Sequence, residues 1–275
     1  MKKILIVLSI MLLNFAFATD WDSTAALKRV NTIGTKILKA NNINHSIEFK
    51  VSEEDTINAY ANIDKEVFVY KGLLEFVDTD DELAGVISHE MGHIINGHCA
   101  KQGVLNSIIA TIASIFKPST TTGTVANAVG QQLASSKISR NDEFEADLTG
   151  VDLMTKGGYN PLGMVSLLQK ISQSYLDILQ SHPSGEKRVQ NAYNYINYNY
   201  PDYIKKGYST TSYKEALNIM ASTLNTRNSS EAAYNKYVKE QKKLLAKKQK
   251  RELKMQGNST VWDGYYNTLQ YMAGN

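Results

Sequence analysis

Apolar residues recur at helical spacing over most of the chain and form short strand-like runs in two places. The helical spacing is clear over 22–41, and acidic residues at 80–82 open another helix that runs to about His98. Residues 46–51 and 66–70 are rich in β-branched and aromatic side chains, which is typical of strands. Further helices are predicted for 139–156, 160–180, 186–199, 212–225 and 230–256. The pattern therefore predicts an α+β fold that is mainly helical, with a small sheet.

Residues 103–137 have a different pattern, because an apolar stretch without a charged residue covers 104–116. Lys117-Pro118 breaks this stretch, a small polar loop follows, and a weaker apolar segment covers 125–133. This arrangement predicts a helical hairpin. The hairpin is either buried in the domain, which the pattern slightly favours, or exposed as a flap or membrane-touching element.

The first 18 residues predict a secretory signal peptide. Lys2 and Lys3 precede an apolar run from Ile4 to Phe15, and a small-residue cleavage site ends at Ala18. An uncleaved membrane anchor is the alternative, but the run is short for a bilayer span. We therefore expect cleavage after Ala18 and a periplasmic protein, with extracellular release as the other destination.

Composition and charge narrow the class of protein. The chain has 275 residues, of which 43% are hydrophobic and 21% charged, so it is an ordinary globular protein and not a disordered or collagen-like one. Cys99 is the single cysteine, which excludes an internal disulfide. Without Lys2 and Lys3 the net charge falls from +3 to +1, yet residues 236–254 alone carry +7.

This basic segment is local, and it does not predict nucleic-acid binding. Residues 234–256 instead predict an amphipathic helix, for which two interpretations are open. The helix packs on the body of the protein and keeps a solvated basic face. Alternatively, it docks on an anionic membrane surface or an acidic partner.

The most specific motif is His89-Glu90-Met91-Gly92-His93. Two histidines four residues apart share one face of a helix, so their imidazoles can converge on one Zn²⁺ ion. The intervening Glu90 lies next to the water that such an ion binds and can take its proton. The spacing therefore predicts a hydrolytic zinc site with Glu90 as the general base.

A third ligand is expected from 139–147, where Glu143 and Asp147 are also four residues apart on one helical face. Glu143 can complete a site of two histidines and one glutamate, and Asp147 can bind the outer nitrogen of a ligand histidine. Glu145 lies on a different face, and we expect it to be solvated. A wholly solvated acidic face is the alternative, but it is the weaker one after an H-E-x-x-H motif.

The metzincin pattern is excluded. It has glycine three residues and histidine six residues after the second motif histidine, and here Asn96 and Cys99 occupy those positions. His98 lies about 140° round the helix from His93, so we expect it to pack or to end the helix and not to reach the metal. Cys99 is expected to be a small buried hydrophobic residue.

With these paired motifs, the chain resembles the gluzincins of metallopeptidase family forty-eight over residues 25–198. Besides the zinc motifs, the matching segments are Asn58-Ala59-Tyr60, Val67-Phe68-Val69, Gly72-Leu73-Leu74, Ser139-Arg140, Ser181-His182-Pro183 and Arg188. The resemblance implies a zincin fold with a small edge-strand sheet. It divides the chain into the signal peptide at 1–18, a zinc metallopeptidase domain at 19–204 and a helical, basic extension at 205–275.

The resemblance also implies roles for the matched residues. Glu90 would be the general base. His182 would stabilise the oxyanion or occupy the metal's open position in a latent state, and a plain surface turn residue is the alternative. Arg140 and Arg188 would clamp the acids of the site or the substrate, or act as structural ion-pair partners. One Zn²⁺ ion would be bound by three ligands, His89, His93 and Glu143.

Two functions are compatible with such a site. The first is a secreted zinc endopeptidase that hydrolyses envelope proteins in protein quality control, with the extended substrate adding to 66–70 as an edge strand. The second is a chaperone-like envelope assembly factor in which the zinc site is latent. Glu90 favours the enzyme, because a structural zinc site has no need of a general base. A purely structural site is weaker still, since three protein ligands leave one position open.

Overall fold

The computed structural model describes residues 21–43, 47–103, 139–173, 182 and 185–257. The predicted signal peptide lies outside the described residues. The two apolar segments of the predicted hairpin, 104–116 and 125–133, lie outside them as well.

The N-terminal part is a helix packed on a three-stranded sheet. Helix α2 (Ser23–Ala40) precedes strand β1 (Glu48–Ser52), which runs parallel to β3 (Glu66–Tyr70). Strand β2 (Ala59–Ala61) pairs antiparallel with the other side of β3. Both predicted strands are confirmed. The expectation that 66–70 is an edge strand open to substrate is wrong, because hydrogen bonds to β1 and β2 occupy both of its sides.

Helix α4 (Asp80–Ile95) carries the H-E-x-x-H motif. Thr79 caps its start, since the hydroxyl accepts a hydrogen bond from the backbone N–H three residues on, and acidic residues fill the first turn as predicted. The helix ends at Ile95 and does not continue to His98. Asn96 and Gly97 form a turn in which Gly97 has a φ of 72°, and a new helical turn begins at His98.

The remaining helices follow the predicted ranges closely, and two short ones, α3 and α11, add to them. Helix α8 ends at Ser172 with Gln173 as its C-cap, so it does not run continuously to 180 as predicted, and residues 174–180 lie outside the described residues. The bounds are α3 (Lys71–Phe76), α7 (Arg140–Lys156), α8 (Leu162–Ser172), α10 (Glu186–Asn199), α11 (Pro201–Lys206), α12 (Thr211–Asn228) and α13 (Glu231–Gly257).

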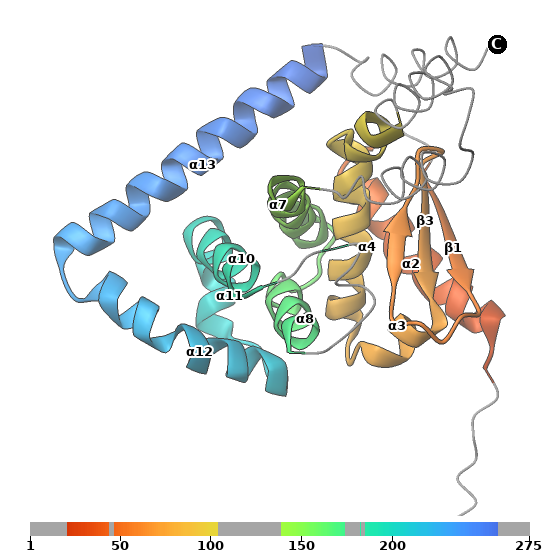
Figure 1. The fold of residues 1–275 in the computed structure, drawn as a ribbon, viewed down its shortest axis with the longest axis horizontal. Coiled ribbons are helices and arrows are strands. Elements are labelled where there is room, and N and C mark those ends of the chain that lie inside the picture. Colours follow the sequence, from red (N-terminus) through yellow and green to blue (C-terminus); the bar gives the residue numbers. More distant parts are fainter. Residues whose placement is uncertain (1–20, 44–46, 104–138, 174–181, 183–184, 258–275) are drawn as a thin grey trace, which may run out of the picture.

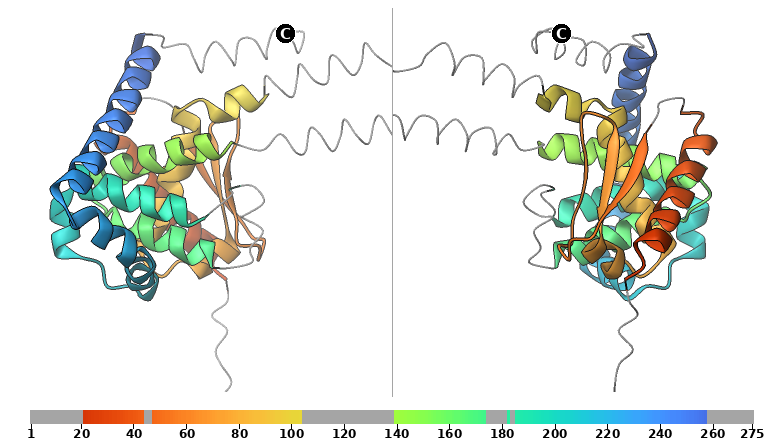
Figure 2. Two further views of the ribbon diagram at one scale, coloured as in Figure 1. Left: turned by 60° about the vertical axis from the view of Figure 1, so that its left-hand side comes forward. Right: turned by 90° about the vertical axis from the view of Figure 1, so that its right-hand side faces the viewer.

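Helix α4 runs through the middle of the molecule, between the sheet and the group of helices α7, α8 and α10 (Figure 1). Every residue of α4 from Glu82 to Ile94 is buried. Helix α13 lies on the side of the molecule away from the sheet (Figures 1 and 2). Across the described ranges, no helix combines the length and the apolar character that a membrane span requires.

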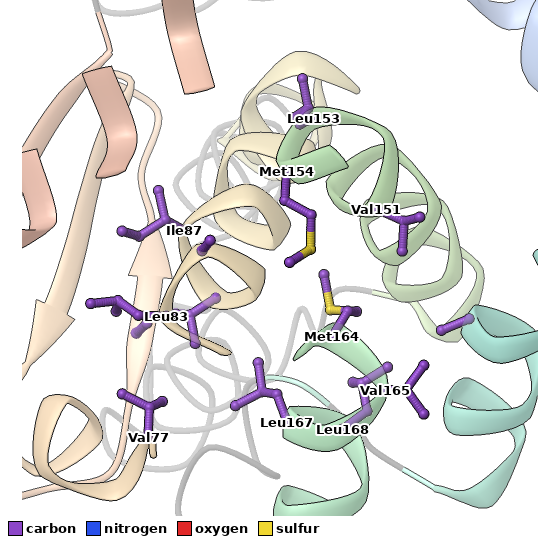
Figure 3. Packing of buried hydrophobic residues seen from close by; sticks show 14 of the residues in the cluster. Val77, Leu83, Ile87, Val151, Leu153, Met154, Met164, Val165, Leu167 and Leu168 are labelled. Atoms are coloured by element: carbon purple, nitrogen blue, oxygen red, sulfur yellow. The ribbon is translucent and has the colours of Figure 1, made fainter. Parts of the chain in front are cut away.

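Side chains from α4, α7 and α8 fill the space between these helices (Figure 3). Met154 of α7 and Met164 of α8 are fully buried there, and Leu83 and Ile87 are fully buried on the side of α4 that faces the sheet. Burial of one side chain of this size contributes about 1.5–3 kcal/mol to folding. Tyr213 of α12 belongs to the same cluster of buried residues, so the core continues into the C-terminal helices.

Helix α13 has one buried stripe and one basic face. Tyr237 and Gln241 are buried, and the Tyr237 hydroxyl donates a hydrogen bond to the Asn194 carbonyl at 2.9 Å. This contact agrees with the interpretation that the helix packs on the body. The opposite face carries the exposed lysines Lys236, Lys239, Lys242, Lys243 and Lys250.

Candidate active site

The site forms where α4 and α7 approach each other most closely. A Cβ atom at Gly92 would lie 2.8 Å from the backbone oxygen of Ala146, and one at Gly150 would lie 3.1 Å from the backbone nitrogen of His89. Side chains at these two positions would push the helices apart. The glycine inside the H-E-x-x-H motif therefore lets the histidines of α4 reach the acids of α7.

Four predicted side chains converge at this crossing. The Nε2 atoms of His89 and His93 are 3.0 Å apart. Glu143 Oε1 lies 3.3 Å from His93 Nε2, and its Oε2 lies 3.5 Å from His89 Nε2. His182 Nδ1 lies 3.2 Å from Glu143 Oε1 and 3.4 Å from His89 Nε2. All four residues are buried.

These residues fit a zinc ion. A tetrahedral Zn²⁺ with ligand bonds of about 2.0–2.2 Å needs ligand atoms about 3.3–3.6 Å apart, close to the separations observed. The donor set of imidazole nitrogens and one carboxylate is also the set that zinc prefers in hydrolases. Glu90 lies beside the cluster with its Oε2 buried and, among the described residues, without a hydrogen-bond partner. His89, His93 and Glu143 would hold the ion.

Asp147 and Arg188 form the support of this cluster. Asp147 Oδ1 lies 2.9 Å from the outer nitrogen of His89, Nδ1, as expected from the sequence. The Arg188 guanidinium donates two hydrogen bonds of 2.7 Å to the Asp147 carboxylate, and its Nη1 lies 2.6 Å from Glu143 Oε2. Of the two predicted arginines, Arg188 thus joins the acids of the site. Arg140 is exposed at the start of α7, and the structure gives it no contact with them within the described residues.

Burial and charge act in opposite directions on these groups. Burial favours neutral His89, but the Asp147 and Glu143 carboxylates outweigh it and raise the His89 pKa to about 10. Burial lowers the pKa of His93 to about 3, and the neighbouring His89 and His182 act in the same direction. Burial alone would raise the pKa of Glu143, but the surrounding histidines hold it well below its usual range. In the metal-free protein, His89 is therefore the protonated histidine of the cluster.

His98 is buried and lies outside the group of metal-ligating side chains, in agreement with the prediction that it packs and does not reach the metal, although α4 does not continue as far as His98. The turn at Gly97 brings it back against α4, where its Nδ1 lies 3.0 Å from the Nδ1 of His93. Its Nε2 faces the carboxylates of Asp142 and Glu145, at 3.5 and 3.4 Å. Burial lowers the pKa of His98 to about 4. The Asn-Gly pair at 96–97 is a helix stop signal that could have identified this turn.

Glu145 is not solvated as predicted. Its side chain is 26% exposed, and it forms ion pairs with Arg251 and Lys247 of α13 in addition to its contact with His98. The prediction placed it on a separate helical face from Glu143, and that part agrees with the structure. What the sequence could not indicate is that a helix from the far end of the chain covers this face.

Cys99 is only partly buried. Its Sγ donates a hydrogen bond to the Ala61 carbonyl at 3.5 Å, next to strand β2. Burial of the thiol raises its pKa to about 12, so it is not an activated nucleophile. The expectation of a small buried hydrophobic residue is therefore met only in part, because the side chain is partly exposed.

Residues 25–196 match the protein-family model described as "Peptidase family M48". The chain belongs to peptidase family M48. The match confirms the resemblance drawn from the motifs and the mainly helical zincin fold that it implied. It also supports the enzyme class expected from the sequence, a metalloendopeptidase.

Several M48 relatives share this region. The chain is 28% identical to the beta-barrel assembly-enhancing protease of Yersinia pestis over 61% of its own length and 38% of that protein. It is 31% identical to the metalloprotease LoiP of Escherichia coli K12, over 59% of this chain and 68% of the relative. It is 33% identical to the metalloprotease YcaL of the same strain, over 56% of this chain and 65% of the relative. The chain thus spans between about two fifths and two thirds of these relatives.

Proposed function

We propose that this protein is a secreted, zinc-dependent endopeptidase that hydrolyses peptide bonds in envelope proteins. The observation that carries the proposal is the convergence of the His89, His93 and Glu143 ligand atoms beside Glu90, whose Oε2 is buried and has no hydrogen-bond partner among the described residues. A structural zinc site would not need that carboxylate. One relative is named for enhancing β-barrel assembly, which supports envelope proteins as the substrate class.

Each residue of the site would have a separate role. When bound, a zinc ion would polarise the scissile carbonyl and make a water molecule a better nucleophile. Glu90 would take the proton from that water and deliver it to the leaving amine. Asp147 would hold the outer nitrogen of His89, and Arg188 would hold Asp147 in turn. The orientation of the His89 imidazole would therefore be fixed before the metal or the substrate binds.

Strand β2 is the better candidate for substrate pairing. Backbone hydrogen bonds join Tyr70 to Asn58 and Asn62 to Glu66, so in the alternating ladder Ala59 and Ala61 turn their N–H and C=O groups to the outer edge. There the Ala59 N–H donates to the Asn58 side chain and the Ala61 carbonyl accepts from Cys99, so a pairing substrate would have to displace these two contacts. Helix α4, which carries the motif histidines, packs against β2. An extended peptide would add there as a fourth strand.

The variant Ala61→Pro tests this placement, because it removes an outward N–H without removing a bond to β3. We expect kcat/KM for a long peptide to fall about tenfold, the effect of one lost hydrogen bond of about 1.4 kcal/mol. Ala61→Ser keeps the N–H and should retain wild-type kinetics. Equal activity of the proline and serine variants would contradict pairing at β2.

The position of His182 favours a second candidate, a latent protease that acts mainly as a chaperone-like assembly factor. His182 Nδ1 lies within 3.4 Å of ligand atoms of both His89 and Glu143, where it would compete with water for the fourth position at the metal. Its Nε2 lies 3.5 Å from Glu90 Oε1. In this latent state, His182 would cover both Glu90, the general base, and the open position at the metal.

The exposed lysines of α13 support a loose association with an anionic membrane or an acidic partner. Replacing Lys236, Lys239, Lys242 and Lys243 by Gln leaves the buried stripe intact. Each basic residue near an anionic surface contributes about 1 kcal/mol, so the quadruple variant should lose salt-sensitive binding to anionic vesicles. Vesicle binding that is unchanged by the substitutions would exclude this docking face.

Casein cleavage tests the peptidase function itself. We expect fragments from the zinc-loaded protein or, if it is latent, from the His182→Ala variant. A chelator should abolish the cleavage and added Zn²⁺ should restore it. Failure of both zinc-loaded proteins to cut casein or a small peptide would refute the proposal.

A further inference from the structure

Each of the two motif histidines has a partner for its outer nitrogen. His89 Nδ1 faces Asp147, which Arg188 of α10 holds in place. His93 Nδ1 faces His98 Nδ1 at 3.0 Å, and His98 is 3% exposed. The second arrangement has no part in the function proposed so far.

The direction of the bond between His93 and His98 follows from the cluster. The Nε2 atom of His93 points at the other ligand atoms, so its proton must reside on Nδ1 when Nε2 binds a metal. His93 therefore donates, and His98 Nδ1 accepts. The proton of neutral His98 then resides on Nε2 and points at Glu145 Oε2 at 3.4 Å. Arg251 Nη2, 3.2 Å from the same nitrogen, therefore contacts His98 without donating a hydrogen bond to it.

Arg251 of α13 fixes the far side of this chain of contacts. Its guanidinium forms an ion pair with Glu145, and its Nη2 donates a hydrogen bond of 2.7 Å to the carbonyl of Asn96, the residue that ends α4. A cavity of about 360 Å³, lined by residues such as Gln241 and Leu244, separates this part of α13 from α7. Arg251 thus reaches the site across a gap, through its side chain.

We propose that His98 and Arg251 are positioning residues for the zinc site. His98 orients the imidazole of His93, and Arg251 holds both Glu145 and the end of α4, so that helix α13 completes the support of the metal. The inference rests on the proposed function only in that Zn²⁺ is the ion that His93 binds. It gives the C-terminal helix a role in the site that a solvated basic helix would not have.

The test is the apparent zinc dissociation constant, measured by competition with a chromogenic chelator. Loss of an outer partner typically weakens metal binding 10–100-fold, and we expect this for His98→Phe. His98→Asn places an amide oxygen at the position of Nδ1 and should recover most of the affinity. Arg251→Met should weaken binding up to about tenfold, whereas Lys250→Met, which removes the same charge from the exposed neighbour, should not change it.

Urea unfolding of the metal-free variants, carried out beside the zinc-affinity measurement, shows whether each variant is folded. Arg251 is partly exposed, so Arg251→Met keeps the inference testable even if His98→Phe does not fold. Wild-type zinc affinity in a folded His98→Phe protein would overturn the inference. Equal weakening by Arg251→Met and Lys250→Met would also overturn it.

This readout is independent of hydrolysis. A wild-type protein that binds zinc but cuts no peptide would refute the peptidase function and leave the inference in place. An active wild-type enzyme whose zinc affinity does not respond to His98 or Arg251 would refute the inference alone.

Discussion

Replacing Arg188 by Met should strongly destabilise the metal-free protein. Arg188 is 5% exposed and makes three charge-assisted contacts, two of 2.7 Å with Asp147 and one of 2.6 Å with Glu143. Methionine fills much of the same volume, so the substitution removes the charge and leaves only a small cavity. Two buried carboxylates then share the charge of protonated His89, which lies 2.9 Å from Asp147 and 3.5 Å from Glu143, and one negative charge is left uncompensated.

The expected loss is about 3–5 kcal/mol. Each hydrogen bond to a charged group contributes about 1.5–3 kcal/mol, but the three contacts share one guanidinium and do not add. Removal of one partner from a buried ion pair costs about 3–5 kcal/mol because the remaining charge is uncompensated. For a protein of this size, that loss lowers the melting temperature by about 6–20 °C.

Urea unfolding of the metal-free protein, followed by circular dichroism, measures this free energy. Arg140→Met is the matched control, because Arg140 is exposed and should change stability by at most about 0.5 kcal/mol. Arg188→Lys keeps the charge but not the two parallel hydrogen bonds, so it should fall between the two. A loss below about 1 kcal/mol for Arg188→Met would refute the assignment of Arg188 as the cation that compensates both acids.

Three other predictions concern the same site. Gly92→Ala should separate α4 from α7, lower stability by about 1–3 kcal/mol and weaken zinc binding, measured by unfolding and chelator competition; unchanged zinc affinity would contradict the close approach. The metal-free protein should be most stable near pH 6.5 in urea unfolding. The raised pKa of His89 stabilises the fold at pH 6.5, and this stabilisation is lost as pH rises towards about 10. The lowered pKa of His93 also stabilises the fold at pH 6.5, and this stabilisation is lost as pH falls towards about 3. A stability that does not change from pH 5 to 9 would contradict this prediction. His182→Ala should keep zinc and raise the turnover of a small peptide by opening the fourth position, whereas lower turnover would assign His182 to the oxyanion.

The parts of the site that the sequence predicts correctly depend on spacing within one helix. His89 and His93 are one turn apart, as are Glu143 and Asp147, and helical geometry alone places each pair on one face. The contact of Asp147 with His89 follows once the two helices are paired. Helical spacing alone is therefore enough to predict which of these side chains share a face.

The parts that the sequence misses depend on where elements stop and what they meet. The prediction that His98 packs without reaching the metal agrees with the structure, but it assumed a continuous helix. A two-residue turn with a left-handed glycine instead brings His98 against the outer nitrogen of His93. The contact between Glu145 and Arg251 joins distant parts of the chain, so no local pattern reports it. The order of the strands is likewise set by tertiary pairing, which put 66–70 in the centre of the sheet.

The most direct test of the account is the Glu90→Gln variant, with zinc content and peptide hydrolysis measured on the same samples. Gln occupies nearly the same space as Glu but cannot accept a proton, so only the base is removed. We predict a full complement of one zinc ion per chain, as in the wild type, together with a fall of at least about 100-fold in turnover. A zinc-loaded Glu90→Gln protein with near-wild-type turnover would contradict the account.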